Sequence, residues 1–578
     1  MKRLKVLLVF SLCAGLALGS FGCDRNTAGS GPVTPKLVVV IVVDQFRYDY
    51  VERFRDVFGP DGFRRLMDKG ALFTNANYIY IPTFTAPGHA AIFTGSVPAL
   101  NGIVGNNWFD RNAADGTSPN KVMVADDTAK LVTSWGQQTN TKATKPASPR
   151  IMIGTTFGDQ MRLATGFKSK VVAISFKDRA AVLPGGKEAN GAFWFDASSG
   201  TMVSTDYYFQ DMPKWVNKFN SEDRANKYYD QTWDKALSPE AYSATQAITT
   251  DVAGTPLERS FPHVLKTGVA KGSEDYYKAF QYTPFASDYL ADFAKAAIEG
   301  ESLGADKYPD LLAISFSTPD LVGHAYGPDS EEIEDTYIRL DRTLADFLNY
   351  LDSKIGLSNV LIAMTGDHGV APVPPYMAIH NVDAGTLDPA KYIEAARTAL
   401  SNKYGKDEQC DTDTDPKRDK CWVQTLVNDQ LYLNEKMMAD KKADPAEAEH
   451  IAGEAVMTVP GLMRYFTRTQ IIEGRMPQGV LSQRLTNGFN PVRSGDVWLI
   501  TKPFDFILGE GSIATTHGGP YNYDTHVPII LFGTGIRSGR YYSECSPSDI
   551  APTISAMLGV EPPSGRVGRV LSEALVTD

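Results

Sequence analysis

The chain has 578 residues, of which 43% are hydrophobic and 22% are charged, and its formal net charge is -11 at pH 7. This composition is typical of a folded globular enzyme and excludes a disordered or fibrous chain. The acidic balance argues against nucleic acid as a partner, so any bound anion must be held by local cations or metals.

The N-terminus is predicted to be an export signal spanning residues 1–22. Basic residues in Met1–Lys5 precede the apolar stretch Val6–Gly19, which is short for a membrane span. The bulky Phe21 makes a poor lipoprotein box before Cys23. We therefore expect a periplasmic or secreted protein, and the alternative is a lipid anchor on Cys23 as the sole contact with a membrane.

Apart from Cys13 in the signal and Cys23 directly after it, the chain has three cysteines, namely Cys410, Cys421 and Cys545. Cys410 and Cys421 flank a short polar stretch and could close a surface loop by a disulfide, which suits an oxidising compartment. The alternative is two free surface thiols. The spacing of the cysteines does not fit a zinc finger.

Five apolar runs along the chain are predicted to be strands, and polar residues adjoin each of them. A helix is predicted over residues 50–70, after the first run. The runs with their neighbouring polar residues are Lys36–Val43 before Asp44, Ser169–Phe176 before Lys177 and Arg179, Asp310–Phe316 before Asp320 and His324, Asn359–Met364 before Asp367 and His368, and His526–Gly533 after His517.

A long helix is predicted between the third and fourth runs, over residues 330–354, because apolar residues recur there at helical spacing. Strand, helix and strand in this order imply a right-handed crossover and an α/β fold with a mostly parallel central sheet flanked by helices. Ligands of such sheets bind beyond the carboxyl ends of the strands. The polar residues that follow the strands are therefore expected to meet in one site.

The stretch Pro82–Gly95 contains Thr85, whose hydroxyl is predicted to lie at the start of a helix. Pro87 is tolerated in the first turn of a helix, so Thr85 would lie at a helix N-terminus, where anions are favoured. A hydroxyl there is either an N-cap or a nucleophile whose pKa must be lowered.

The residues at the strand ends form a set that suits metal ions. Singly, each could be a cap or a turn residue. Together they supply three carboxylates and three imidazoles, the mixed oxygen and nitrogen ligands that zinc accepts. With Thr85 as a further ligand, the set is sufficient for two Zn²⁺ ions.

In order along the chain, the motifs Thr-Ala-Pro-Gly-His, Thr-Gly-Asp-His-Gly and Thr-His-Gly at these positions resemble the alkaline phosphatase superfamily. The likeness is strongest to its phosphate-irrepressible branch with a threonine nucleophile, the PafA type, and spans nearly the whole mature chain. It implies a zinc-dependent hydrolase of phosphate monoesters that acts through a phosphothreonine on Thr85.

The resemblance also implies the role of each site residue. One zinc would bind Asp320, His324 and His517, and the other would bind Asp44, Asp367, His368 and the Thr85 hydroxyl. Asn106, Lys177 and Arg179 would contact the phosphoryl oxygens. If strand geometry continues past the second run, Lys177 and Arg179 share one side.

The rest of the chain is predicted to be one catalytic domain over residues 36–578. Regions without clear periodicity are expected as cap insertions at about 110–150, 185–284 and 382–503. The family resemblance implies a monomer, and the expected partners are small phosphate monoesters.

Two other functions stay open. A phosphodiesterase or nucleotide pyrophosphatase of the same superfamily shares the threonine and the metal ligands, so only the Lys177/Arg179 pair favours monoesters. An exported binding protein with an inactive site is the second alternative, and absence of bound zinc would favour it. A sulfatase is disfavoured because Thr85 cannot be converted to formylglycine.

Overall fold

The structure is a computed structural model that describes residues 34–113, 118–135, 144–242, 257, 259–407, 410, 419–508 and 513–576. The predicted signal, residues 1–22, and Cys23 lie outside these ranges. Within them, no helix is long and apolar enough to cross a bilayer.

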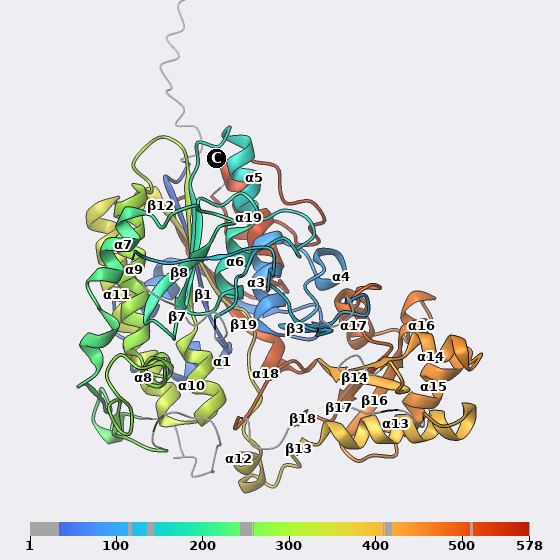
Figure 1. Ribbon diagram of the computed structural model, residues 1–578. Helices are drawn as coiled ribbons and strands as arrows, with labels where there is room; N and C mark the ends of the chain where they lie inside the picture. Colours follow the sequence, from blue (N-terminus) through green and yellow to red (C-terminus); the bar gives the residue numbers. More distant parts are fainter. Residues whose placement is uncertain are drawn as a thin grey trace, which may run out of the picture. The chain divides into compact units, whose positions relative to one another are not determined.

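A large mixed sheet forms the centre of the molecule (Figure 1). Its five middle strands, β12, β1, β11, β6 and β7, run parallel, and the outer strands pair mainly antiparallel. In spatial order the sheet contains β20 (Gly539–Tyr541), β2 (Ala71–Asn77), β19 (His526–Gly533), β12 (Val360–Gly366), β1 (Leu37–Val43), β11 (Asp310–Phe316), β6 (Val171–Ser175), β7 (Gly191–Asp196), β8 (Thr201–Thr205) and β5 (Leu131–Val132). The predicted α/β fold is confirmed.

Strand β1 explains why a continuous apolar run is read as a central strand. Its odd-numbered residues, such as Val39 and Ile41, belong to one core cluster, and its even-numbered residues, such as Val38 and Val40, belong to another. Because side chains alternate across a strand, both faces of the sheet are covered.

Helices cover the two faces of the sheet (Figure 1). One face carries α2 (Phe63–Lys69), α7 (Lys214–Ser221), α8 (Glu274–Gln281), α9 (Phe285–Glu301) and α11 (Glu331–Lys354). The other carries α3 (Thr85–Thr94), α5 (Phe157–Ala164), α6 (Arg179–Gly185) and α19 (Ile550–Leu558). Shorter helices near the site are α4 (Pro98–Asn101), α10 (Thr318–Tyr326), α12 (Pro374–Ile379) and α18 (Asn522–Thr525).

The two helix predictions have different outcomes. The helix expected over 330–354 is α11, and the Ser330 hydroxyl caps it by accepting a hydrogen bond from Ile333 N. The helix expected over 50–70 is wrong in its middle, since α1 (Asp49–Arg53) and α2 are separate helices. Pro60 follows Gly59 in the gap, and a proline disfavours helix both at itself and at the residue before it.

The segment expected as the third insertion, 382–503, builds a sheet and core of its own. Strands β14 (Val423–Val427), β15 (Gln430–Leu433), β17 (Val497–Thr501) and β16 (Leu462–Thr467) pair in that order. Helices α13 (Pro389–Tyr404) and α15 (Pro445–Val456) pack on this sheet around a separate apolar cluster, with α14 (Glu435–Asp440) and α16 (Arg468–Ile472) beside α15. Helix α17 (Val480–Gly488) contacts α4. Strand β13 (Gly385–Leu387) pairs with β18 (Asp505–Ile507). We refer to residues 385–508 as the cap.

The other two expected insertions are more closely joined to the catalytic core. Segment 110–150 contributes β5 to the central sheet, and its β4 (Asn120–Val122) pairs with β3 (Asn107–Phe109). Segment 185–284 supplies β7 and β8 to the same sheet and also contains β9 (Thr232–Trp233) and β10 (His263–Val264). Much of it therefore extends the sheet.

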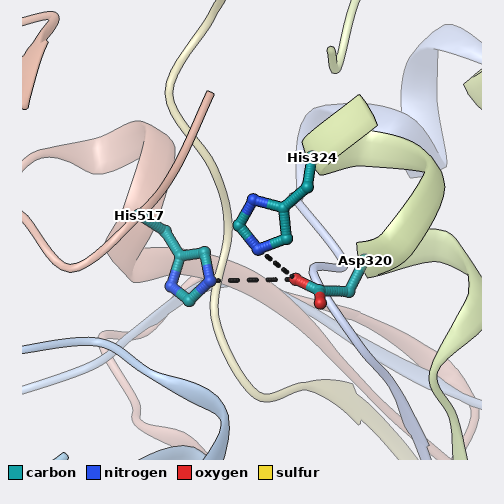
Figure 2. A group of neighbouring side chains, drawn as sticks. All are labelled: Asp320, His324 and His517. Carbon is teal, nitrogen blue, oxygen red and sulfur yellow. Dashed lines mark ion pairs between the residues drawn. The ribbon is translucent and has the colours of Figure 1, made fainter. Parts of the chain in front are cut away.

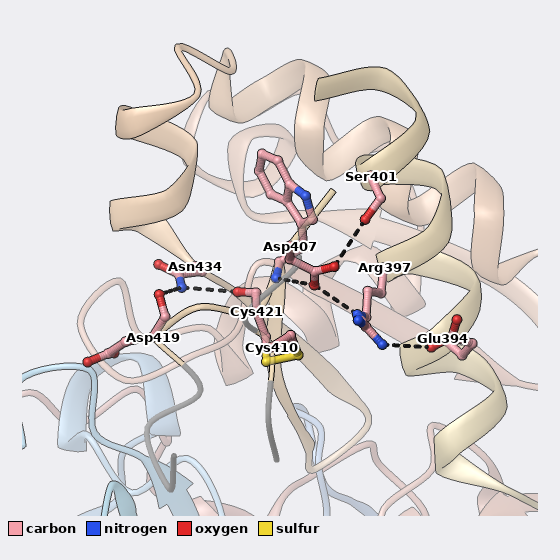
Figure 3. The surroundings of a disulfide bond; sticks show 9 residues. Glu394, Arg397, Ser401, Asp407, Cys410, Asp419, Cys421 and Asn434 are labelled. Carbon is pink, nitrogen blue, oxygen red and sulfur yellow. Dashed lines mark hydrogen bonds and ion pairs between the residues drawn. A yellow bond between two sulfur atoms is a disulfide. The ribbon is translucent and has the colours of Figure 1, made fainter. Parts of the chain in front are cut away.

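A disulfide links Cys410 and Cys421 in the cap, which is the first of the two alternatives weighed for this pair (Figure 3). Beside it, the Asp407 carboxylate accepts hydrogen bonds from Arg397 Nε at 2.8 Å and from the backbone N–H of Trp422 at 3.2 Å. The disulfide and this polar cluster fasten the loop after α13 to the start of β14.

Candidate active site

Six acidic and histidine side chains gather at the carboxyl ends of neighbouring strands. Because β12, β1 and β11 are adjacent in the sheet, the residues that follow these strands meet there. The loop before α18 adds the last histidine. The side chains form two groups that could each hold a metal ion: Asp320, His324 and His517, which we call triad 1, and Asp44, Asp367 and His368, which we call triad 2.

Triad 1 combines one helix with a distant loop (Figure 2). Asp320 and His324 lie one turn apart on α10, so both project from the same face. Asp320 Oδ1 lies 3.1 Å from His324 Nε2 and 3.7 Å from His517 Nε2. Figure 2 shows both rings turned toward this carboxylate.

Triad 2 surrounds the Thr85 hydroxyl. His368 Nε2 lies 3.4 Å from Asp44 Oδ1, 3.6 Å from Asp367 Oδ2 and 3.4 Å from Thr85 Oγ1. A tetrahedral zinc with bonds of about 2.0–2.1 Å has ligand atoms about 3.3 Å apart. The three distances from His368 Nε2 are therefore close to those between ligands of one such ion, and the ligand atoms of triad 2 all lie within 4.8 Å of one another.

Two carboxylate oxygens in triad 2 support this fit. Asp44 Oδ1 and Asp367 Oδ2 are buried, and neither accepts a hydrogen bond from the described residues. A buried carboxylate oxygen without a partner is costly, and a bound cation would satisfy both atoms. The donor set of triad 2 therefore fits a metal ion.

The three histidines are oriented by backbone carbonyls. The Nδ1 atom lies 2.7 Å from Thr515 O in His324, 2.9 Å from Gly369 O in His368 and 2.7 Å from Thr83 O in His517. Since a carbonyl only accepts, each Nδ1 donates its proton, and the Nε2 lone pair is left to face the triads.

Burial keeps two of these rings neutral. It lowers the pKa of His517 to about 3, helped by the nearby His324, and lowers the pKa of His368 well below its usual value, helped by His517. The rings of His368 and His517 stack at 3.5 Å between centroids, which joins the two triads. Neutral imidazole is the form that binds metals.

Lys177 lies between the two triads. Its Nζ donates to Asp44 Oδ2 at 2.6 Å and to Asp320 Oδ2. Burial, and then the charge of Asp320, raises the pKa of Asp44 to about 6, although Lys177 opposes this shift. One ammonium group thus forms ion pairs with a carboxylate from each triad.

The condition under which Lys177 and Arg179 were expected to share one side, a continuing strand, is not met. Strand β6 ends at Ser175, and Arg179 is the first residue of α6. Asp178 between them accepts a hydrogen bond from the Arg179 backbone N–H. The chain turns here because this helix starts immediately, so only Lys177 reaches the triads by a direct contact between described residues.

Thr85 is the first residue of α3, and its side chain does not cap the helix. The N-cap is Phe84, and no side-chain cap hydrogen bond is formed. Asn106 Oδ1 instead accepts the N–H of Ala86 at 2.8 Å, which places Asn106 directly beside Thr85. This excludes the N-cap interpretation of the Thr85 hydroxyl and leaves it facing triad 2.

Gln45 contacts both triads, and it was not among the site residues predicted from the sequence. Its backbone N–H donates to Asp367 Oδ1 at 3.0 Å, and its Nε2 donates to Asp320 Oδ1 at 2.9 Å, so it touches one carboxylate of each triad. Its φ of 65° lies in the left-handed region. The sole signal in the sequence was its position directly after Asp44.

His89 was assigned a structural role, and its contacts agree with one. Its Nδ1 donates to Thr85 O at 2.8 Å, and its Nε2 accepts from the Ser315 hydroxyl at 2.8 Å. Nearby Gly88 allows α3 to approach β12 closely, because a Cβ there would lie 2.2 Å from Asp367 O. Both residues hold Thr85 against triad 2.

Comparison with known proteins identifies the class. The crystal structure of the alkaline phosphatase PafA matches this fold with a TM-score of 0.83 at 33% identity, covering 94% of this chain and 99% of that one. The fold is therefore that of the alkaline phosphatase superfamily. The chain belongs to its type I phosphodiesterase / nucleotide pyrophosphatase family, whose model matches residues 38–519.

Full-length relatives place the chain more closely. The alkaline phosphatase PafA of Elizabethkingia meningoseptica is 35% identical over 559 residues, which is 96% of this chain and 97% of the relative. The alkaline phosphatase PhoV of Synechococcus elongatus is 37% identical over 550 residues, covering 94% and 93%. The predicted resemblance to PafA-type alkaline phosphatases is confirmed.

Proposed function

We propose that this protein is an alkaline phosphatase that hydrolyses phosphate monoesters, with Thr85 as the nucleophile. The observation that carries the proposal is the position of the Thr85 hydroxyl, 3.4 Å from His368 Nε2, among donor atoms spaced as the ligands of one metal ion. The relatives named as alkaline phosphatases support the same activity.

We infer that the cofactor is a pair of Zn²⁺ ions. Triad 1 would hold one ion, and triad 2 with Thr85 Oγ1 would hold the other. Bound there, the ions would lower the pKa of the threonine hydroxyl and neutralise the attacking and leaving oxygens of an in-line displacement. Carboxylate and imidazole ligands favour zinc over magnesium or calcium.

The protein's own groups then have separate tasks. Thr85 Oγ1 attacks phosphorus, the bond to the leaving alcohol breaks, and water hydrolyses the resulting phosphothreonine. The Asn106 side chain, held by Ala86 N–H, lies where it can donate to a phosphoryl oxygen. Lys177 balances the triad carboxylates and can bind an oxygen between them. Arg179 would bind the remaining oxygen of a dianionic monoester.

The test is the ratio of kcat/KM for p-nitrophenyl phosphate to that for bis-p-nitrophenyl phosphate. We expect the zinc-loaded protein to prefer the monoester strongly. Arg179→Ala should lower the monoester rate and leave the diester rate nearly unchanged. Arg179 is a cleaner probe than Lys177, because Lys177 also contacts Asp44 and Asp320. A matched control is Arg111→Ala, since Arg111 pairs with Asp496 in the cap.

Other results would lead to other functions. A diester preference that Arg179→Ala does not alter would assign a phosphodiesterase or nucleotide pyrophosphatase and leave the metal site intact. Zinc binding without turnover of either ester would contradict the hydrolytic function. Failure to bind zinc would favour a binding protein with an inactive site.

We also propose that the protein works outside the cytoplasm as a monomer. The predicted signal over residues 1–22 and the Cys410–Cys421 disulfide support export. The mass of the mature N-terminus distinguishes cleavage by ordinary signal peptidase from a diacylglycerol on Cys23. Light scattering after gel filtration tests the monomer.

A further inference from the structure

A cavity of about 350 Å³ adjoins the candidate active site. Phe84, Asn106 and His517 line one side of it, and all three lie next to Thr85 or belong to triad 1. The other side is lined by residues of the cap, including Asn428 and Asp429. A phosphate group held near Thr85 would therefore extend its ester substituent into this space.

The cap residues are fixed over the site by a tight hairpin. Asn428 and Asp429 form the two-residue turn between β14 and β15, with φ values of 54° and 57°, as a type I′ turn requires. Asn428 Nδ2 donates to the backbone carbonyl of Asn107 at 2.8 Å. This bond ties the turn to the residue beside Asn106, so Asp429 is held at the cavity wall.

The charged residues that line the cavity are acidic. Among the described lining residues, Asp429, Asp505 and Asp524 are carboxylates, and none is a lysine or an arginine. Asp524 is 2% exposed, and its Oδ2 accepts the N–H groups of Gly518 and Gly519, whereas its Oδ1 has no partner among the described residues. Burial raises the pKa of Asp429 to about 7, so this carboxyl group is fully ionised only in alkaline solution.

Aromatic and aliphatic side chains complete the walls. Phe84, Phe506 and Tyr523 line the cavity, and Phe84 packs edge-on against His517. Aromatic faces together with carboxylates, without a lysine or arginine among the described lining residues, form the chemistry that binds alkylammonium and quaternary ammonium groups. Asp505 is the carboxylate that also lies near a cation, Lys502, and accepts the N–H of Gly385. A second phosphate or a carboxylate would be repelled by the same walls.

We propose that this cavity binds the leaving alcohol and selects phosphate monoesters whose alcohol carries a cationic nitrogen. This inference rests on the proposed phosphatase function. It assigns Asp429 and Asp505 to substrate discrimination, at a distance from the groups that contact phosphorus. Esters of the same size with an anionic alcohol are disfavoured.

The test uses two aryl phosphates of equal shape. One carries a meta trimethylammoniomethyl group, and the other carries the neutral neopentyl group, so they differ mainly in one charge. The quantity measured is the ratio of kcat/KM for the cationic ester to that for the neutral ester. Differences in intrinsic reactivity are the same for every variant, so a change in the ratio reports the cavity alone.

We expect the ratio to fall at least tenfold in Asp429→Asn/Asp505→Asn. Asparagine tolerates the left-handed conformation of residue 429, so the turn should be retained. Asp440→Asn is the matched control, because Asp440 is an exposed cap residue that does not line the cavity, and its ratio should equal that of the wild type.

Each outcome has one meaning. An equal ratio in the wild type and the double variant would overturn the proposed selection of cationic esters. If the neutral ester is still hydrolysed in that case, the phosphatase function stands. No hydrolysis of the neutral ester or of p-nitrophenyl phosphate would refute the proposed function itself. As a second measurement, the cationic phenol should inhibit the wild type more strongly than the neutral phenol, and this difference should shrink in the double variant.

Discussion

Replacing Gln45 with methionine removes its side-chain hydrogen bonds to Asp320 and leaves its backbone hydrogen bond to Asp367 in place. The Gln45 Nε2 atom donates to Asp320 Oδ1 at 2.9 Å, whereas the contact with Asp367 Oδ1 comes from the backbone N–H. Methionine has nearly the same shape and the same backbone, so only the bond to triad 1 is lost. We therefore expect Gln45→Met to weaken metal binding at triad 1 and to spare triad 2.

The magnitude follows from the type of bond. A hydrogen bond to a charged group contributes about 1.5–3 kcal/mol, which is about 10- to 150-fold in a dissociation constant. Residues that orient metal ligands typically change affinity by about 10- to 100-fold, in agreement. Part of the stability that the metal-free fold loses with this bond should be offset, because methionine also removes Gln45 Oε1, a buried acceptor without a partner among the described residues.

The assay is a competitive zinc titration of the metal-free protein with a chromophoric chelator. One of two dissociation constants should rise at least tenfold, and the other should stay within about twofold. Gly323→Ala offers an independent perturbation, since its Cβ would lie 1.7 Å from Gln45 Oε1 and displace the amide. The double variant should then be no weaker than the weaker single variant. Equal weakening of both sites, or of neither, would refute the reasoning.

The remaining predictions concern the nucleophile, one buried histidine and the disulfide. Thr85→Ala should lower kcat/KM for p-nitrophenyl phosphate at least about a thousandfold, and Thr85→Ser should retain measurable turnover, as steady-state kinetics would show. Burial lowers the pKa of His89 from 6.5 to about 3. Between these two pH values His89 is protonated in the unfolded chain and neutral in the folded protein, so the free energy of unfolding falls as the pH falls from 6.5 toward 3. Urea unfolding of the metal-free protein measures how much the free energy of unfolding falls between pH 7 and pH 5. This fall should be smaller by about 2 kcal/mol in His89→Gln than in the wild type, and an equal fall in both would contradict the prediction. Cys410→Ser/Cys421→Ser should lower the free energy of unfolding of the cap by about 2–3 kcal/mol, because the unfolded chain gains the entropy of the opened loop. The value of kcat/KM should not change, and a cap that unfolds like the wild type would argue against a stabilising disulfide.

The central strands could be predicted because they depend on local sequence, and the grouping of the site residues could be predicted because it follows from the way such strands assemble into a parallel sheet. Strand β1 is buried on both faces, and the sequence of such a strand is an unbroken run of apolar residues. Asp44 and Asp367 directly follow β1 and β12, which are neighbours in parallel register. Their meeting therefore follows from the topology, without knowledge of any side-chain contact.

The failed predictions depended on contacts across the chain. In the predicted helix over 50–70, the Asp341 carboxylate accepts the N–H of Gly59 at 2.8 Å and that of Phe63 at 2.6 Å. A side chain from α11 thus satisfies the backbone where the helix is interrupted. Lys177 and Arg179 were likewise misjudged, because the sequence does not mark the end of β6 before the Asp178 turn.

The ring orientation of the three histidines in the triads could not be predicted from the sequence, for a general reason. Their Nδ1 partners are the carbonyls of Thr83, Gly369 and Thr515, not side chains. Every residue carries a carbonyl, so no residue type signals these contacts. Any residue type at position 83 or 515 would still supply a carbonyl, whereas at Gly369 a Cβ would lie 2.0 Å from Tyr523 O and would shift the backbone. A shift of the backbone at any of the three positions would rotate an imidazole and remove a ligand. The orientation of the three imidazoles is therefore set by the backbone path at Thr83, Gly369 and Thr515, which the structure reveals and the sequence does not.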